Sequence, residues 1–405
     1  MRLMLSCIAL LFLAEAHAAS WQFDAPIPVT SATGPKVFHH LESSGRHNIA
    51  VSGQSVAVVW EDDRDGVSRI YLAHKELTAP AFGPDFMLSG SDDAFEPSIV
   101  GLGGGLFAVA WEEDGRVHAR ILGGNRPGPV FTVDAGDSVQ ASLATNGSEL
   151  LLASAEREER FARIVLHRLR PGENGVLSET AHCAVDLELP SDEQLYPALT
   201  AVQGQIIVAW EDRRPGHTII MASTSVPDMA CRFAPPQRIS LRPEGRGKTP
   251  YGKGHGVSRV AVAGYGPSAV FAAWADKRDF REGYDIYGAS WQAGKGFGAN
   301  VRVQDEFGGV ARQWHASVAG NPPGGDLVVA WDDERDGDPN IMLSWFADGE
   351  WSEDTPLPGA SGPGVQAHPS ITLDADGNLY AAWVERDTVN GPTRLRYAYG
   401  RRVAE

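Results

Sequence analysis

A two-strand unit with a charged turn recurs seven times along the 405 residues. Its clearest copy, residues 327–346, reads LVVAWDDERDGDPNIMLSWF. An apolar run ending in Trp precedes a turn rich in Asp, Arg and Gly, and a second apolar run follows, which predicts a β-hairpin. The copies are anchored at Trp60, Trp111, Ser154, Trp210, Trp274, Trp331 and Trp383. Their spacing of about 43–64 residues is typical of four-stranded propeller blades.

The repeat therefore predicts an all-β chain, a seven-bladed β-propeller of four-stranded antiparallel blades. The seventh copy ends soon after its third strand, and the missing outer strand must come from elsewhere. Residues 21–30 (WQFDAPIPVT) resemble the outer-strand segment 82–90 (FGPDFMLSG). We expect this N-terminal strand to close the ring, because an open row of blades would leave unpaired strand edges.

The first 18 residues have the pattern of a secretory signal peptide. Arg2 precedes an apolar run over residues 3–13, and Ala16-His17-Ala18 forms a small-x-small cleavage site. We expect residues 19–405 to be the mature protein, a single propeller located in the periplasm or secreted. The apolar run is too short for a membrane span, and no later stretch is apolar enough for one.

Two cysteines, Cys183 and Cys231, remain after the signal segment. An even pair in an exported protein predicts a disulfide, and both cysteines fall near the outermost strands of consecutive repeats. The alternative is a pair of buried free thiols.

The formal net charge of −17 argues against nucleic acid or an anionic membrane as the partner, because those partners require basic surfaces. No haem-attachment, phosphate-loop or nucleophile-elbow motif occurs in the sequence. We therefore expect no cofactor, a monomer, and a glycan or protein as the partner.

The repeat motif, apolar-apolar-Ala-Trp-x-Asp-x-Arg-x-Gly followed by Ile-Tyr, resembles the repeats of sialidase-like propellers and of the periplasmic Tol-system propellers. The resemblance covers nearly the whole mature chain and implies the fold. A sialidase would also carry an Arg-Ile-Pro segment, Ser-x-Asp-x-Gly-x-x-Trp boxes, an arginine triad and a Tyr/Glu pair. This chain has no Arg-Ile-Pro, and Asp374-Ala-Asp376-Gly377 lacks the leading serine. Propellers of this kind include glycosidases, lyases and binding scaffolds.

An acidic residue lies two positions after each anchor: Asp62, Glu113, Glu156, Asp212, Asp276, Asp333 and Glu385. In four copies an arginine follows, namely Arg64, Arg214, Arg278 and Arg335. Repetition favours a structural role for these residues in closing the turns and pairing blades.

Three segments break the repeat: residues 242–256, 276–284 and 304–315. The first is Gly-rich and basic, and in propeller order all three lie on one face. We predict a basic, aromatic-edged ligand site formed by Tyr251, Lys253, His255, Arg278, Arg281, Arg312, Trp314 and His315. Guanidinium groups bind carboxylate, sulfate or phosphate, and aromatic faces stack on flat rings and sugars. The alternative is a flexible loop that pairs with nearby acids.

His315 and His368 directly precede inner strands, and His47 lies within one residue of that position. His39 and His40 lie in the link into the first blade. The alternative is convergence on a metal, but the sequence has no short metal-ligand spacing, so we predict no metal and expect these side chains to cap strand ends.

The resulting functional hypothesis is an exported, non-catalytic recognition scaffold that binds a glycan, peptide or protein over blades four to six. The alternative is a sialidase-like or other carbohydrate-active enzyme, a glycoside hydrolase or lyase, with Asp276 and Glu282 as its acid pair. A third hypothesis is structural packing within a larger envelope complex.

Overall fold

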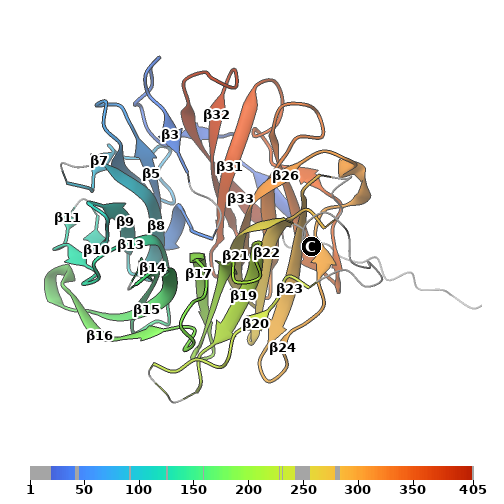
Figure 1. Ribbon diagram of the computed structural model, residues 1–405. Helices are drawn as coiled ribbons and strands as arrows, with labels where there is room; N and C mark the ends of the chain where they lie inside the picture. Colours follow the sequence, from blue (N-terminus) through green and yellow to red (C-terminus); the bar gives the residue numbers. More distant parts are fainter. Residues whose placement is uncertain are drawn as a thin grey trace, which may run out of the picture.

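The computed structural model describes residues 20–41, 45–90, 93–124, 126–157, 159–227, 229, 231–241, 256–278 and 283–403. These residues form seven antiparallel sheets arranged as the blades of a propeller (Figure 1). The signal-peptide prediction for residues 1–18 lies outside them. The described residues include no helix long and apolar enough to cross a membrane.

The first four blades follow the chain in order. Blade 1 contains β3 (His39–His40), β4 (Ile49–Ser52), β5 (Ser55–Asp62), β6 (Arg69–Glu76) and β7 (Phe86–Met87). Blade 2 contains β8 (Ala94–Gly103), β9 (Leu106–Glu113), β10 (Arg116–Gly123), β11 (Arg126–Pro127) and β12 (Phe131–Thr132). Blade 3 contains β13 (Ser138–Thr145), β14 (Leu150–Arg157), β15 (Ala162–Pro171) and β16 (Leu177–Ala184), with the short 3₁₀ turn η1 (Glu173–Gly175). Blade 4 contains β17 (Gln194–Val202), β18 (Gln205–Asp212), β19 (Ile219–Thr224) and β20 (Gln237–Arg238).

The last three blades complete the ring. Blade 5 contains β21 (Val257–Tyr265), β22 (Ala269–Asp276), β23 (Asp285–Gln292), β24 (Gly296–Phe297) and β25 (Val301–Arg302), and η2 (Glu306–Gly308) follows it. Blade 6 contains β26 (Gln313–Gly320), β27 (Leu327–Asp333), β28 (Asn340–Ala347), β29 (Glu350–Trp351) and β30 (Thr355–Pro356). Blade 7 contains β31 (Val365–Leu373), β32 (Leu379–Arg386) and β33 (Arg394–Val403), with β1 (Ser20–Phe23) and β2 (Ile27–Pro28) paired to β33.

The N-terminal strand closes the last blade, as the sequence predicts. Trp21 lies opposite Arg402 in the β1–β33 register, and its indole Nε1 donates to the carbonyl oxygen of Gly377 at 2.8 Å. Its ring also meets the Trp345 ring edge-on, with centroids 5.7 Å apart. The two ends of the described chain therefore join in one sheet.

The apolar core lies between blades. Each of seven buried clusters draws its residues from two consecutive blades, including a cluster between blades 7 and 1. Second strands are apolar on both faces because each blade is covered on both sides. The six anchor tryptophans lie in these clusters and are at most 1% exposed.

The acids two residues after the anchors have the structural role that the sequence predicts. The Trp331 indole donates to Asp333 at 3.0 Å, and Arg335 binds the same carboxylate. Equivalent bonds join Trp60 to Asp62, Trp111 to Glu113, Trp210 to Asp212, Trp274 to Asp276, and Ser154 to Glu156. Some arginines also pair neighbouring blades, since Arg214 reaches Asp186 at the end of blade 3. These carboxylates belong to the architecture.

A disulfide joins Cys183 of β16 to Cys231, so the prediction from the two cysteines is confirmed. The bond links the outer strand of blade 3 to the segment before the outer strand of blade 4.

Replacing both Cys183 and Cys231 with serine should lower the free energy of unfolding. The bond closes a loop with a sequence separation of 48 residues. The chain-entropy relation gives a loss of about 4 kcal/mol for a loop of this size. Urea unfolding of the variant and of the reduced wild-type protein measures the effect; equal midpoints for variant and oxidised wild type would contradict it.

Trp331→Phe should destabilise the protein more than Trp383→Phe. Both indoles are fully buried, but only the Trp331 indole bonds an acid; the Trp383 Nε1 has no hydrogen-bond partner among the described residues. Loss of one buried hydrogen bond to a charged group should add about 1–2 kcal/mol to the cost at Trp331. Thermal unfolding of the two variants side by side tests this difference, and equal losses would refute it.

Candidate functional site

A β-bulge near the start of the inner strand recurs in blades 2 to 7. The strand register shifts there, and one residue takes a positive φ of 48–60°: Glu96, Gln140, Tyr196, Arg259, His315 and His368. Arg46 takes the equivalent position in blade 1. A bulge removes a backbone N–H from the strand ladder, so that group needs another partner. We call these seven positions the axial ring.

Acids from the preceding blade satisfy several of these N–H groups. Each acid directly follows an anchor Trp. Glu112 accepts from the Gln140 N–H at 2.5 Å, Glu211 from Arg259 at 2.7 Å, and Asp332 from His368 at 2.8 Å. Glu61 accepts from Glu96 at 3.3 Å. The axial ring is thus held by hydrogen bonds that cross from blade to blade.

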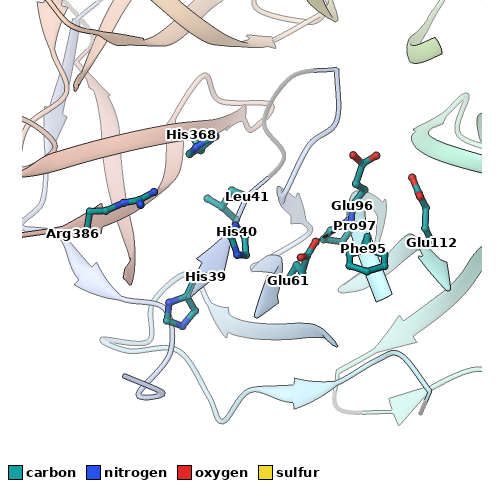
Figure 2. A pocket seen from close by; sticks show the side chains of 10 residues that line it. All are labelled: His39, His40, Leu41, Glu61, Phe95, Glu96, Pro97, Glu112, His368 and Arg386. Carbon is teal, nitrogen blue, oxygen red and sulfur yellow. Dashed lines mark hydrogen bonds between the residues drawn. The ribbon is translucent and has the colours of Figure 1, made fainter. Parts of the chain in front are cut away.

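A cavity of about 340 Å³ lies where blades 7, 1 and 2 meet the axis. It is lined by His39, His40, Leu41, Glu61, Phe95, Glu96, Pro97, Glu112, His368 and Arg386. Figure 2 shows the three glutamates on one side and the histidines with Arg386 on the other. This axial pocket can therefore present hydrogen-bond acceptors to one edge of a ligand and donors to the opposite edge.

Glu112 has the most perturbed acidity of the carboxyl groups that line the axial pocket. Burial raises its pKa to about 8, and the charge of Glu96 and a hydrogen bond with Glu96 add to the rise. The Gln140 N–H and Arg46 oppose it without reversing it. Burial also raises the pKa of Glu61. At pH 7 Glu112 therefore keeps its proton and donates it in the hydrogen bond with Glu96.

The ligand site predicted over blades four to six falls partly on residues that the structure describes. Tyr251, Lys253, His255, Arg281 and Glu282 lie outside the described residues. The described ends of the three loops adjoin one another: the Lys277 N–H donates to the Gly256 carbonyl, and the Gln313 N–H donates to the Tyr284 carbonyl.

Of the predicted ligand residues, Arg312 and Arg278 have different surroundings. The Arg312 side chain is 64% exposed on the link into blade 6. The Arg278 side chain is 11% exposed, binds Asp276 at 2.6 Å and stacks over the Tyr287 ring. Arg312 is thus accessible to a ligand, whereas the Arg278 side chain is held by contacts within its own blade.

The other two described residues, Trp314 and His315, belong to a row of rings that leads to the axial pocket. The Tyr284 ring lies tilted against the Trp314 ring, with centroids 4.1 Å apart. Between centroids, Trp314 lies 6.4 Å from His315, and His315 lies 4.2 Å from His368. His368 also lines the axial pocket. This aromatic row connects the predicted site over blades five and six with the pocket over blades 7, 1 and 2.

Asp276, half of the catalytic pair considered from the sequence, is fully buried. It accepts from the Trp274 indole at 2.9 Å and from Arg278 at 2.6 Å. A carboxylate held in this way cannot approach a sugar ring without disrupting its blade.

The sequence reasoning missed Glu61, Glu112 and Arg386 as site residues. The sequence signal that could have identified the two glutamates is the residue type directly after each anchor residue. That position is acidic in four copies (Glu61, Glu112, Glu211 and Asp332) and apolar in three (Ala155, Ala275 and Val384). Because only four of the seven copies have an acid at this position, the blade structure does not require the acid, and its presence indicates a separate role.

Together, the fold and the site define a seven-bladed propeller with a polar pocket at its axis. No protein-family model matches the chain, and no curated protein matches it. A protein of unknown function from Dyadobacter fermentans has a similar structure, with 11% identity, a TM-score of 0.54, and coverage of 95% of this chain and 99% of that chain.

Two carbohydrate-active enzymes are among the other similar structures. Trypanosoma rangeli sialidase has 12% identity and a TM-score of 0.46, over 78% of this chain and 56% of the sialidase. Penicillium chrysogenum α-L-arabinanase has 12% identity and a TM-score of 0.48, over 93% of this chain and 98% of the arabinanase. The similarity to these two enzymes is one of fold alone.

Glu112→Gln should flatten the pH dependence of stability. The folded protein holds the Glu112 proton to about pH 8, whereas an unperturbed Glu releases it near 4.5. The contribution of the protonated Glu112 to the free energy of unfolding is therefore full below about pH 4.5 and is lost as the pH rises through 8. Glutamine keeps a donor without the ionisation, so at pH 9 the free energy of unfolding of the variant should exceed that of wild type by up to about 5 kcal/mol.

Thermal unfolding between pH 5 and 9 measures this effect. Glu159→Gln, at an exposed position on blade 3, provides the matched control. Parallel pH profiles for Glu112→Gln and wild type would show that the Glu112 carboxyl titrates normally.

Proposed function

We propose that the protein is an exported, non-catalytic recognition protein that binds a glycan across the aromatic row and the axial pocket. The observation that carries the proposal is the continuity of these two features through His368. Aromatic faces stack against the C–H faces of sugar rings, and carboxylates, imidazoles and guanidinium groups bond hydroxyls and acidic substituents.

The two sides of the pocket favour a glycan with both neutral and acidic groups. Glu61, Glu96 and Glu112 provide acceptors for sugar hydroxyls, whereas Arg386 and His368 lie where a sugar carboxylate would find donors. Exposed Arg312 extends the cationic side along the aromatic row. The Cys183–Cys231 disulfide supports location in the periplasm or outside the cell, because such bonds persist in oxidising compartments.

The acid geometry favours binding over turnover. Glycoside hydrolases of the two-carboxylate type hold their acids about 5–9.5 Å apart, on either side of the scissile bond. Glu112 and Glu96 are instead hydrogen-bonded to each other, and Asp276 is enclosed in its blade. The raised pKa of Glu112 is the feature that keeps a carbohydrate-active enzyme as the second candidate, because a general acid must be protonated at neutral pH.

Trp314→Ala and Arg312→Ala should each weaken glycan binding about 10- to 100-fold, because each removes a large contact or a charged donor. Titration calorimetry against acidic and neutral oligosaccharides, with released sugar measured in the same samples, tests both candidates. Saturable binding without release supports recognition, whereas released sugar would establish an enzyme.

Two substitutions serve as controls for that experiment. Phe307→Ala removes an 80% exposed aromatic side chain from the same link, and Arg126→Ala removes an exposed arginine from blade 2. Both should bind as wild type does. Equal binding by wild type and the folded Trp314→Ala and Arg312→Ala variants would remove the aromatic row from the site.

A further inference from the structure

Two histidines and one aspartate from adjacent blades converge at the axis. His315 begins the bulge of β26, Asp332 lies near the end of β27, and His368 lies in the bulge of β31. Each offers one ligand atom, and the three atoms lie within 4.8 Å of one another. Among the described residues, this is the one group of three or more His, Cys, Asp or Glu side chains with such an arrangement.

The backbone positions this cluster closely. His315 and His368 have φ values of 48° and 56°, and the repeated bulge directs both residues into the axial ring. Asp332 is buried, and its two carboxylate oxygens have different partners. Oδ1 accepts from the His368 N–H at 2.8 Å, and Oδ2 lies 2.6 Å from His315 Nδ1. The carboxylate is therefore oriented before any ligand arrives.

The residue types at the cluster depart from the repeat. Histidine occupies the axial ring only in blades 6 and 7, which are consecutive. The acid that directly follows the anchor is glutamate in blades 1, 2 and 4 but the shorter aspartate in blade 6. Structural capping alone does not require these changes, because the Glu112 and Glu211 carboxylates make the same bond to the next blade. Asymmetric residues on a repetitive scaffold indicate a site.

We propose that His315, Asp332 and His368 form a binding site for a divalent transition metal ion. Two imidazole nitrogens and one carboxylate oxygen are a ligand set that suits Zn²⁺ and its neighbours in the first transition row. Three protein ligands leave a coordination position for water or another ligand. His368 also lines the axial pocket, so the ion would border that pocket.

The cluster needs only a small adjustment to fit such an ion. Ligands at about 2.0–2.2 Å from a tetrahedral Zn²⁺ lie about 3.3–3.5 Å from one another. The His315 Nδ1 and Asp332 Oδ2 atoms must separate slightly from 2.6 Å, and the most distant ligand atoms must approach from at most 4.8 Å. Side-chain rotation provides movements of this size. If Nδ1 is the ligand, the ion takes the place of the proton between these two atoms, and the neutral imidazole then carries its one proton on Nε2.

The test uses Zn²⁺ alone and does not depend on a glycan. After chelator treatment and dialysis, the purified protein should bind one Zn²⁺ per chain in titration calorimetry, and Co²⁺ substitution should give a visible absorption spectrum of low coordination number. His315→Ala and His368→Ala should each weaken Zn²⁺ binding about 100-fold or more, because losing a direct ligand costs at least as much as losing its supporting contact. Asp332→Asn should also weaken it.

Three further variants make the experiment specific. His182→Ala removes a histidine whose side chain is 68% exposed on blade 3 and should leave Zn²⁺ binding unchanged. If an alanine variant at the cluster fails to fold, His315→Gln and His368→Gln retain polar side chains for the same measurement. Absence of Zn²⁺ binding by the wild type would overturn the proposal, as would binding that survives substitution of either His315 or His368.

Discussion

Each blade has two apolar faces, and both must be covered by a neighbouring blade. This constraint governs the chain from end to end. It explains why second strands are apolar on both faces, why seven clusters lie between blades, and why the N-terminal strand returns to blade 7. Burial of apolar surface supplies the main driving force, and a ring leaves no apolar blade face open to water.

Covering both faces also buries carboxylates that then need partners. Asp62, Asp212, Asp276 and Asp333 are fully buried, and each is bonded to the indole of its anchor Trp. An isolated charge in such an environment would be costly, whereas a paired and hydrogen-bonded charge is stable. The acids directly after the anchors bond the next blade instead. Two adjacent acids on one strand, such as Glu61 and Asp62, therefore have different roles. Glu61 bonds the next blade, and Asp62 bonds its own anchor Trp.

The sequence predicts the fold because anchor, turn and strand length recur locally. It also predicts the ring-closing strand, the disulfide and the structural role of acids such as Asp333. It does not reveal the axial pocket, because Glu112 comes from blade 2 whereas His368 and Arg386 come from blade 7, and these blades line one pocket only after the ring closes. The raised pKa of Glu112 depends on burial and on Glu96, neither of which can be read from neighbouring residues. The meeting of His315 and His368 depends on bulges whose sequence signal is weak.

The residues of the axial ring in blades 2 to 7 share one backbone conformation but have several different side chains. Glutamate, glutamine, tyrosine, arginine and histidine all occupy the same positive-φ position without a change in blade structure. The chemical character of the axis is therefore separable from the fold. A set of substitutions restricted to these seven positions could redirect the molecule toward new ligands while leaving its inter-blade core intact, provided that β-branched residues, which are strained at positive φ, are avoided.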